Sequence, residues 1–415
     1  MNIVELKVGF FLAYRQIKRS NFWITSLIIL VMMVTFLNLV VISGILIGLI
    51  AGSSNDFRSH YSGDVFVKPK TEYKVIRDTN KIVSMAGGLP EVFDISTRYL
   101  FPVSLENDYK TQLSENKSKN ISSTVLVGIT PTNEDKVTEL SSFLVEGDFL
   151  SENDTNKILV GSSLLSQYSD ALSQNTIKNV KIGSKLRMTV GDNNFHEVIV
   201  KGIIKIKVGD VSQRIFMNKN HMLNLTNLDK NDASEIAITI NPKVESSFVK
   251  ESLQNSKMDE SVLVQTWEEA QGKFFKDLST TFTILGNVIG TIGLVVASIT
   301  IFIVIFINAI SRKKFIGILK GIGVSGGTIR YSYLFQSIFY ATIGSALGLV
   351  ILYGFLVPYF DKNPIDFPFS DGILAVTTAG TLWRLGLLFI ATLIAGFLPA
   401  QIVIRRNTLD SILGR

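Results

Sequence analysis

Four stretches of the chain contain no charged residue, and their lengths decide the class of protein. They cover residues 20–55, 278–311, 331–360 and 385–404. A helix needs roughly 20 apolar residues to cross the hydrocarbon core of a bilayer, which is about 30 Å thick. Each stretch reaches that length. The pattern predicts a membrane protein with four transmembrane helices, at 21–52, 281–310, 331–358 and 383–404.

Between the first two spans the pattern changes to short strand-like and helix-like runs. The segments DVFVKP, STVLVGI, KILVG, KLRMTV, HEVIVKGIIKI and SEIAITI show the β-branched or alternating character of strands. The segments SSLLSQYSDAL and VESSFVKESLQ have the pattern of helices. We therefore expect an α+β domain over residues 53–265.

A predicted stalk, 266–280, joins this domain to the second span. Thr266 is placed as a helix cap and acidic residues follow in the first turn, which favours a helix start. Trp267, Phe274 and Phe275 supply its apolar side chains. We expect the stalk to run into the second span without a break and to transmit motion.

The distribution of positive charge predicts the orientation in the membrane. Three segments hold twelve Lys and Arg residues against only Glu5 and Asp410, so the rest of the chain is net acidic although the whole carries +6. Cytoplasmic flanks retain positive charge. We therefore expect cytoplasmic N and C termini, with the 53–265 domain and a 359–382 loop outside. The twelve residues are Lys7, Arg15, Lys18, Arg19, Arg312, Lys313, Lys314, Lys320, Arg330, Arg405, Arg406 and Arg415.

The cytoplasmic parts are then an amphipathic helix at 1–20, a segment at 311–330 and a tail at 405–415. The first span follows basic residues as a signal peptide does, but its uncharged run is far longer than a signal core of roughly 7–15 residues, which favours an uncleaved anchor. The basic charge then reflects membrane orientation and indicates no nucleic-acid partner. The chain has no cysteine, and His60, His196 and His221 are widely spaced, so a zinc site is not expected.

The stretch GIGVSGG, residues 321–327, matches two catalytic patterns at once. Its glycines fit a dinucleotide-binding fingerprint, and Ser325 fits a nucleophile elbow. The first pattern needs an acidic residue about twenty positions later, and the second needs a histidine after the serine; the sequence supplies neither. We expect these glycines to end a helix and to turn the chain back into the membrane.

The residues just before that stretch predict a docking element for a soluble partner. Phe315, Ile318, Leu319 and Ile322 fall on one stripe of a helix, between basic residues. A short apolar stripe of this kind fits a groove on another protein, although an interfacial helix resting on lipid has the same pattern. The candidate coupling residues are Arg312, Lys313, Lys314, Phe315, Gly317, Ile318, Leu319, Lys320, Gly321, Ile322 and Gly323.

Three pairs of glycines spaced four residues apart predict close helix packing. Small residues at this spacing let two helix backbones approach. They are consistent with packing inside the chain or with an interface between subunits. The pairs are Gly44 and Gly48, Gly286 and Gly290, and Gly344 and Gly348.

The sequence also lacks an energy source of its own. No phosphate-binding loop G-x-x-x-x-G-K-[ST] occurs, and the four uncharged stretches have no ionisable residue with which to couple an ion gradient. Energy is therefore expected from a partner.

These residues resemble the FtsX-like permeases of ABC transporters, a family that includes MacB-type efflux subunits and the lipoprotein-releasing LolC and LolE. RKKFIGILKGIGVSGGTI is similar to the segment that follows the family's second span, and LPAQIVIRRNTLDSI to its closing segment. VGITPTNEDKVTEL, EGDFL, ILVGSSLL, VKIGSKLRM and TWEEAQGKFF look most like the lipoprotein-releasing branch. Phe315 stands where the family usually has Asp or Glu, which puts an acidic contact to the ATPase in doubt.

The resemblance implies a non-catalytic subunit of the bacterial plasma membrane with a MacB-type periplasmic core domain. It implies a cytoplasmic ATPase that binds Mg–ATP, no cofactor on this chain, and a dimer with a second copy or a related permease. The implied function is mechanotransmission of ATP hydrolysis for lipoprotein release, with a lipoprotein cargo or a periplasmic adaptor as further partner. Two alternatives remain: efflux of peptides or macrolide-like compounds, and FtsX-type signalling that activates a cell-wall hydrolase.

Overall fold

The computed structural model describes residues 3–110, 120–169, 175–191, 194–256, 259, 261–311, 313–367, 370–372 and 374–405. The chain divides into two compact units. The helical unit comprises Met1–Ala51, Asp277–Asp366 and Asp371–Arg415, and the α+β unit comprises Gly52–Lys276 and Phe367–Ser370. The two units are treated separately.

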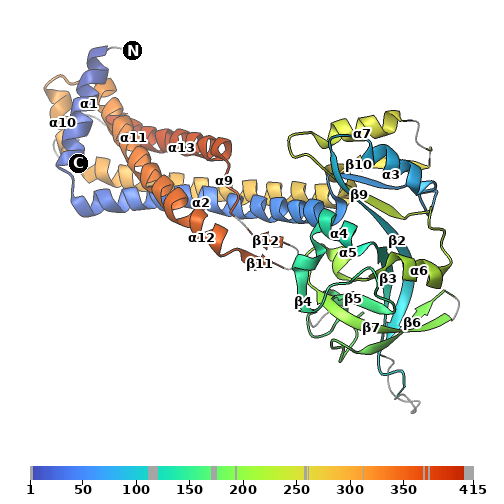
Figure 1. Ribbon diagram of the computed structural model, residues 1–415. Coiled ribbons are helices and arrows are strands. Elements are labelled where there is room, and N and C mark those ends of the chain that lie inside the picture. The colour runs from blue at the N-terminus through green and yellow to red at the C-terminus, as the bar shows by residue number, and fades with distance from the viewer. Residues whose placement is uncertain are drawn as a thin grey trace. The chain divides into compact units, whose positions relative to one another are not determined.

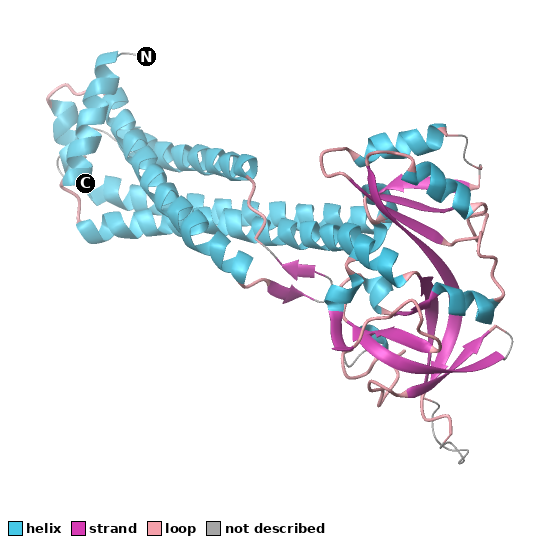
Figure 2. Cartoon of the chain, in the orientation of Figure 1, coloured by secondary structure: helices cyan, strands magenta, loops and turns pink. Residues whose placement is uncertain are grey.

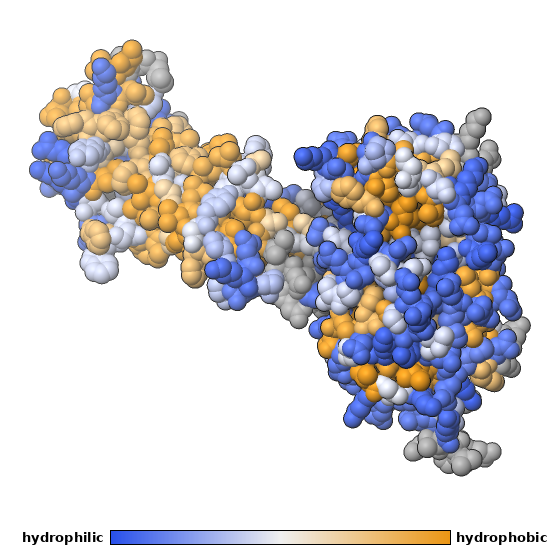
Figure 3. Space-filling model, in the orientation of Figure 1, coloured by the Kyte–Doolittle hydropathy of each residue, from blue (hydrophilic) through white to orange (hydrophobic). Residues whose placement is uncertain are grey.

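The helical unit contains several long helices (Figure 1). Four helices in the described part of the chain are long and apolar enough to cross a membrane: Phe22–Ser62, Phe275–Ile307, Gly326–Lys362 and Thr378–Ile402. Apolar side chains cover most of the visible face of this unit (Figure 3). The predicted architecture, four such helices with an α+β domain after the first, is confirmed. The helices are α1 (Ile3–Lys18), α2 (Phe22–Phe57), α9 (Gly272–Ser311), α10 (Lys313–Gly321), α11 (Gly326–Ile351), α12 (Val357–Lys362) and α13 (Thr378–Arg405).

The predicted packing glycines lie against other parts of the same chain. A Cβ on Gly344 would lie 2.5 Å from Cβ of Met32, and one on Gly348 would lie 2.5 Å from Cδ1 of Phe36. At such distances only glycine lets α11 approach α2. The other four glycines of the three pairs are also in the described part of the chain. Gly286 and Gly290 of α9 face Leu46 and Leu39 of α2, Gly44 faces Leu374, and Gly48 is buried.

The α+β unit is built on one ten-stranded sheet (Figure 2). Strand pairing runs β10-β1-β9-β2-β3-β8-β5-β7-β4, and β6 joins β2 to β7. The pairs β2-β3, β3-β8, β8-β5, β5-β7, β7-β6 and β6-β2 therefore close a ring of six strands. The strands are β1 (Val65–Pro69), β2 (Val92–Glu106), β3 (Ile121–Ile129), β4 (Leu144–Gly147), β5 (Lys157–Gly161), β6 (Lys185–Val190), β7 (Asn194–Ile204), β8 (Arg214–Asn218), β9 (Glu235–Ile240) and β10 (Val262–Thr266).

Strand β2 belongs to both halves of this sheet. Its residues 92–98 pair with β9 in the open part, and its residues 99–106 pair with β3 in the ring, where 103–106 also pair with β6. Its length of 15 residues makes this possible. The helices of this unit are α3 (Thr79–Gly87), α4 (Pro131–Thr138), α5 (Gly209–Ser212), α6 (Lys219–Thr226), α7 (Ser246–Asn255) and α8 (Trp267–Ala270).

One predicted helix is absent and one small sheet was not predicted. SSLLSQYSDAL forms only a 3-10 turn at Ser162–Leu164, and residues 170–172 lie outside the described ones. Leu164 and Leu165 are both buried, and Leu165 bridges to Ile177, so the chain is extended there. The loop predicted at 359–382 contains two short paired strands, β11 (Ile365–Phe367) and β12 (Ser370–Gly372).

The prediction that the stalk is one unbroken helix is wrong, because the helix is interrupted at Gly272. The Thr266 side chain accepts from the amide of Glu269, the Glu269 side chain accepts from the amide of Thr266, and α8 ends after one turn at Ala270. Gly272 has a φ of +75°, a left-handed conformation that interrupts a right-handed helix, and α9 starts there. Phe275 packs on Phe57 with ring centroids 5.9 Å apart. The side chain of Phe274 lies outside the described residues.

Candidate functional site

The candidate coupling segment folds as a short helix with a firmly defined end. Helix α10 spans Lys313–Gly321. Beyond it, the amide of Gly323 donates to the Lys320 carbonyl and the amide of Val324 to the Leu319 carbonyl, both at 3.0 Å. These two bonds and the φ of +92° at Gly323 define a Schellman motif, which stops the helix. The glycines of GIGVSGG thus end a helix, as expected from the sequence.

Helix α10 has a buried and an exposed face. Ile316 is 4% exposed and Gly317 is buried, whereas Phe315, Ile318 and Ile322 are 61%, 46% and 73% exposed. The predicted stripe is therefore exposed at three of its four positions, and Leu319 is half-buried. We call Phe315, Ile318 and Ile322 the α10 apolar face.

The buried side of α10 is attached to the end of α13. The ammonium of Lys320 donates to the carbonyl of Ile404 at 3.1 Å. A Cβ on Gly326 would lie 2.9 Å from Cγ2 of the same Ile404. Lys314 is exposed. Arg312 and the side chain of Lys313 lie outside the described residues.

Ser325 precedes the next helix and caps its N-terminus. Its hydroxyl accepts from the amide of Thr328 at 3.2 Å, which makes it the N-cap of α11. The same hydroxyl donates to the carboxylate of Glu5 at 2.7 Å. Glu5 therefore lies at the positive end of the α11 dipole.

Helix α1 is docked along the first half of α11. Phe10 contacts Phe335 edge to face with centroids 5.4 Å apart, and the Gln336 amide donates to Gln16 at 2.6 Å. Gly9 is buried against Tyr331, where a Cβ would lie 2.8 Å from the Tyr331 Cβ. The sequence predicts only an interfacial helix here, so α1 is more firmly attached than expected.

The chemistry of the site is that of a binding surface. Among the described residues, no three His, Asp or Glu side chains come together in a group that could hold a metal ion. What the arrangement offers is an anchored helix that presents apolar side chains next to a basic one. Such a surface can bind another protein.

The segment lies in a part of the chain that is similar to a known family. Residues 287–408 match the family described as FtsX-like permease C-terminal. The C-terminal part of the chain is thus similar to FtsX-like permeases. Helices α10, α11, α12 and α13 and most of α9 lie within the matched residues.

The chain is also similar to ABC transporter permeases. The chain is 30% identical to the ABC transporter permease YtrF of Bacillus subtilis, over 28% of this chain and 24% of that protein. It is 25% identical to the macrolide export ATP-binding/permease protein MacB of Campylobacter jejuni, over 48% of this chain and 30% of MacB. The chain thus spans less than a third of the length of these relatives.

About half of the chain is similar to a solved structure. The structure is the periplasmic region of MacB from Actinobacillus actinomycetemcomitans. The match covers 51% of this chain and 92% of the MacB region, with 12% identity and a TM-score of 0.35.

Sequence reasoning missed the contact between Glu5 and Ser325. The two residues are 320 positions apart, so no local pattern connects them. The signal that was available is Ser325 followed by a helical segment, which is typical of an N-cap.

Proposed function

We propose that this chain is the permease subunit of an ABC transporter and that the α10 apolar face binds the ATPase. The observation that carries the proposal is the exposure of Phe315, Ile318 and Ile322 on a helix that Lys320 and the Schellman motif hold in place. A helix that is held in place can transmit a displacement caused by a bound protein to the helices that follow it. The match of this region to FtsX-like permeases supports the proposal.

In this proposal the ATPase is a separate cytoplasmic chain that binds and hydrolyses Mg–ATP. The N and C termini are cytoplasmic, and the α+β unit lies outside the plasma membrane. The positive charge of the predicted cytoplasmic segments supports this orientation. The subunit works as a dimer, either with a second copy or with a related permease.

The proposed cargo is a lipoprotein or a similar amphiphile taken from the outer leaflet. The resemblance of several α+β-unit segments to lipoprotein-releasing permeases supports this cargo; one of them, VGITPTNEDKVTEL, contains α4. Export of peptides or macrolide-like compounds is the second candidate, and the similarity to the C. jejuni macrolide exporter favours it. Cross-linking of radiolabelled lipoproteins or of a labelled macrolide to the membrane-bound complex distinguishes the two.

The docking claim is tested by recovery of the ATPase with the tagged permease. Phe315→Ala/Ile322→Ser removes most of the α10 apolar face, and we expect it to lose the ATPase that co-purifies with the wild type. Phe93→Ala is the matched control, because Phe93 is 59% exposed but lies on β2 in the α+β unit. Equal recovery with both variants refutes the docking site. Failure of the wild type to recover any ABC ATPase refutes the ABC transporter assignment.

A further inference from the structure

Two helices enter the α+β unit, and they are attached to it in different ways. Helix α2 continues through a π turn at Arg58–Ser62 directly into strand β1. Helix α9 follows strand β10 only after the short helix α8 and the break at Gly272. The difference determines which helix can move the sheet.

The end of α2 is held by a buried tyrosine. Tyr61 donates its hydroxyl to Glu235 of β9 at 2.7 Å, and its carbonyl accepts from Arg98 of β2 at 2.7 Å. The guanidinium carbons of Arg98 and Arg214 each lie 5.1 Å from the centre of its ring. Such cation–π contacts are stronger when water is excluded, and Tyr61 is 9% exposed.

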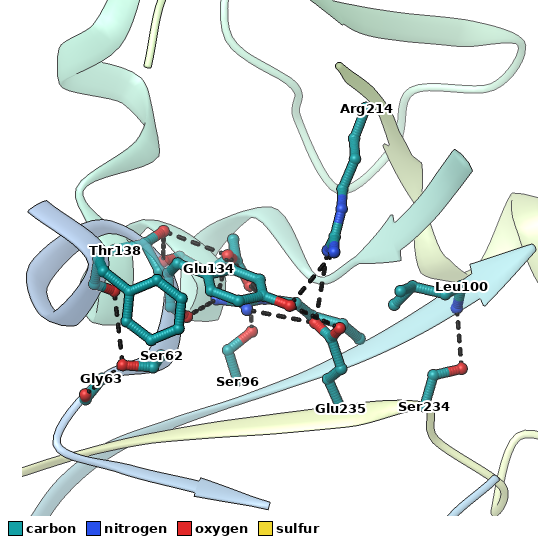
Figure 4. A network of polar contacts seen from close by, with 12 residues as sticks. Ser62, Gly63, Ser96, Leu100, Glu134, Thr138, Arg214, Ser234 and Glu235 are labelled. Carbon is teal, nitrogen blue, oxygen red and sulfur yellow. Dashed lines mark hydrogen bonds and ion pairs between the residues drawn. The ribbon is translucent and has the colours of Figure 1, made fainter. Parts of the chain in front are cut away.

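Two basic and two acidic side chains beside Tyr61 form ion pairs, and Glu134, Arg214 and Glu235 among them are labelled in Figure 4. Arg98 pairs with Glu134 at 2.8 Å, and Arg214 pairs with Glu235 at 3.5 Å. The four groups come from β2, α4, β8 and β9. We call Tyr61 with these four side chains the α2 anchor. Because each charge has a partner and little water reaches it, moving Tyr61 out would expose or unpair several of them.

Backbone contacts reinforce this attachment just after the π turn. Gly63 has a φ of +64°, and a Cβ there would lie 2.6 Å from the Ile238 carbonyl oxygen. The amide of Asp64 donates to that same carbonyl, and the Asp64 carboxylate accepts from the amide of Ile240, both at 2.8 Å. The turn is therefore fixed on β9 through both main chain and side chain.

The attachment of α9 lacks a comparable set of buried groups among the described residues. None of the residues of α8 is buried, and nothing lies within 4 Å of the position that a Cβ on Gly272 would take. Gln271 exchanges hydrogen bonds with Ser54 of α2, and beyond the break Phe275 packs on Phe57. Helix α9 is thus held beside α2 but is separated from β10 by an open glycine.

We propose that α2 is the rigid connection that moves the sheet and that Gly272 is a joint that frees α9 from β10. In this arrangement, α9 moves together with α2 and transmits no force to β10. The residues of the α2 anchor are then positioning residues for transmission. The proposal rests on the proposed function, because a permease of this kind needs such a transmission path, but its geometry can be tested without any ATPase.

The experiment measures distances between spin labels in the full chain, reconstituted alone in lipid nanodiscs. The chain has no cysteine, so Asn55→Cys and Lys243→Cys supply a single labelled pair, one on α2 and one in the loop after β9. We expect a narrow distance distribution in the wild type. Tyr61→Ala should broaden it, whereas one glycine inserted after Gly272 should leave it unchanged.

Each outcome decides the proposal. An unchanged width in Tyr61→Ala, or an equal broadening by the glycine insertion, overturns it. If Tyr61→Ala does not fold, Tyr61→Phe takes its place. It keeps the ring and removes only the hydroxyl, with its bonds to Glu235 and Arg214. A broadening in the same direction is expected, and no broadening overturns the proposal. Because no ATPase is present, this result is independent of whether the chain belongs to an ABC transporter.

Discussion

Removing Arg98 should destabilise the α+β unit more than an ordinary substitution. Arg98 is 2% exposed, and its guanidinium makes two contacts of 3.0 Å and one of 2.8 Å with the Glu134 carboxylate. Burial alone would lower the pKa of Arg98, but Glu134 beside it raises that pKa above its ordinary value. Arg98 is therefore charged, and Arg98→Met would leave the buried Glu134 carboxyl group without its guanidinium partner.

The expected loss follows from the burial of the charge that remains. Breaking a buried ion pair by removing one partner costs about 3–5 kcal/mol, whereas replacing both partners by apolar residues is neutral or stabilising. Arg98→Met should thus cost about 3–5 kcal/mol of unfolding free energy. The combined variant Arg98→Met/Glu134→Met should recover most of this, since Arg214 and Glu235 still balance each other. Ser96→Ala is added to it because the Ser96 hydroxyl donates to Glu134 at 2.6 Å.

Urea unfolding of the detergent-solubilised chain measures both variants. Trp23→Phe and Trp383→Phe in the background leave Trp267, which lies in the α+β unit, as the fluorescent reporter. We expect the urea concentration at the unfolding midpoint to be lower in Arg98→Met than in the wild type, and to be close to the wild-type value in the combined variant. A combined variant as unstable as Arg98→Met would show that the pair contributes through its specific geometry, and the charge-balance reasoning would be refuted.

Three further predictions concern packing, ionisation and capping. Gly344→Ala should lower the free energy of unfolding by about 1–3 kcal/mol through overpacking against Met32. Gly386→Ala should leave it unchanged, because nothing lies within 4 Å of the added Cβ. Equal destabilisation in thermal unfolding would contradict this. Burial raises the pKa of Tyr99 to about 12, so stability should fall as pH rises from about 10 to 12, and tyrosinate absorbance, compared with Tyr99→Phe, should show no ionisation of this residue near pH 10. Ser325→Ala should lower the free energy of unfolding by about 0.5–2 kcal/mol, seen as a lower melting temperature, whereas Ser325→Thr should retain the cap. Equal destabilisation by the two substitutions would exclude a capping role.

The sequence was sufficient for features that depend on local pattern. The four apolar helices follow from uncharged runs, and the end of α10 follows from glycines that can adopt positive φ. The position of the break in the stalk was missed, although the Thr266 cap and Gly272 were both visible. A glycine inside a helical pattern is often tolerated, and only its φ of +75° shows that this one is not helical.

Features that depend on distant residues could not be predicted. Arg98 and Glu134 are 36 positions apart, and Tyr61 and Glu235 are 174 apart. Their pairing depends on the strand order of the sheet, which places β9 next to β2. A buried charge in a single sequence looks like any other charged residue on a strand, so the α2 anchor had no sequence signal.

The two ends of α2 explain how a motif that resembles a catalytic loop could serve transmission. At its start, α2 follows α1 after three residues, and α1 is tied to the N-terminus of α11 by Glu5 and Ser325. At its end, Tyr61 holds it in the sheet. A displacement of α10 would reach α11 through a connection of only four residues, then α1, and then α2. In the proposed transporter, the bond between Ser325 and Glu5 therefore links the connection between α10 and α11 to α1, the helix that precedes α2.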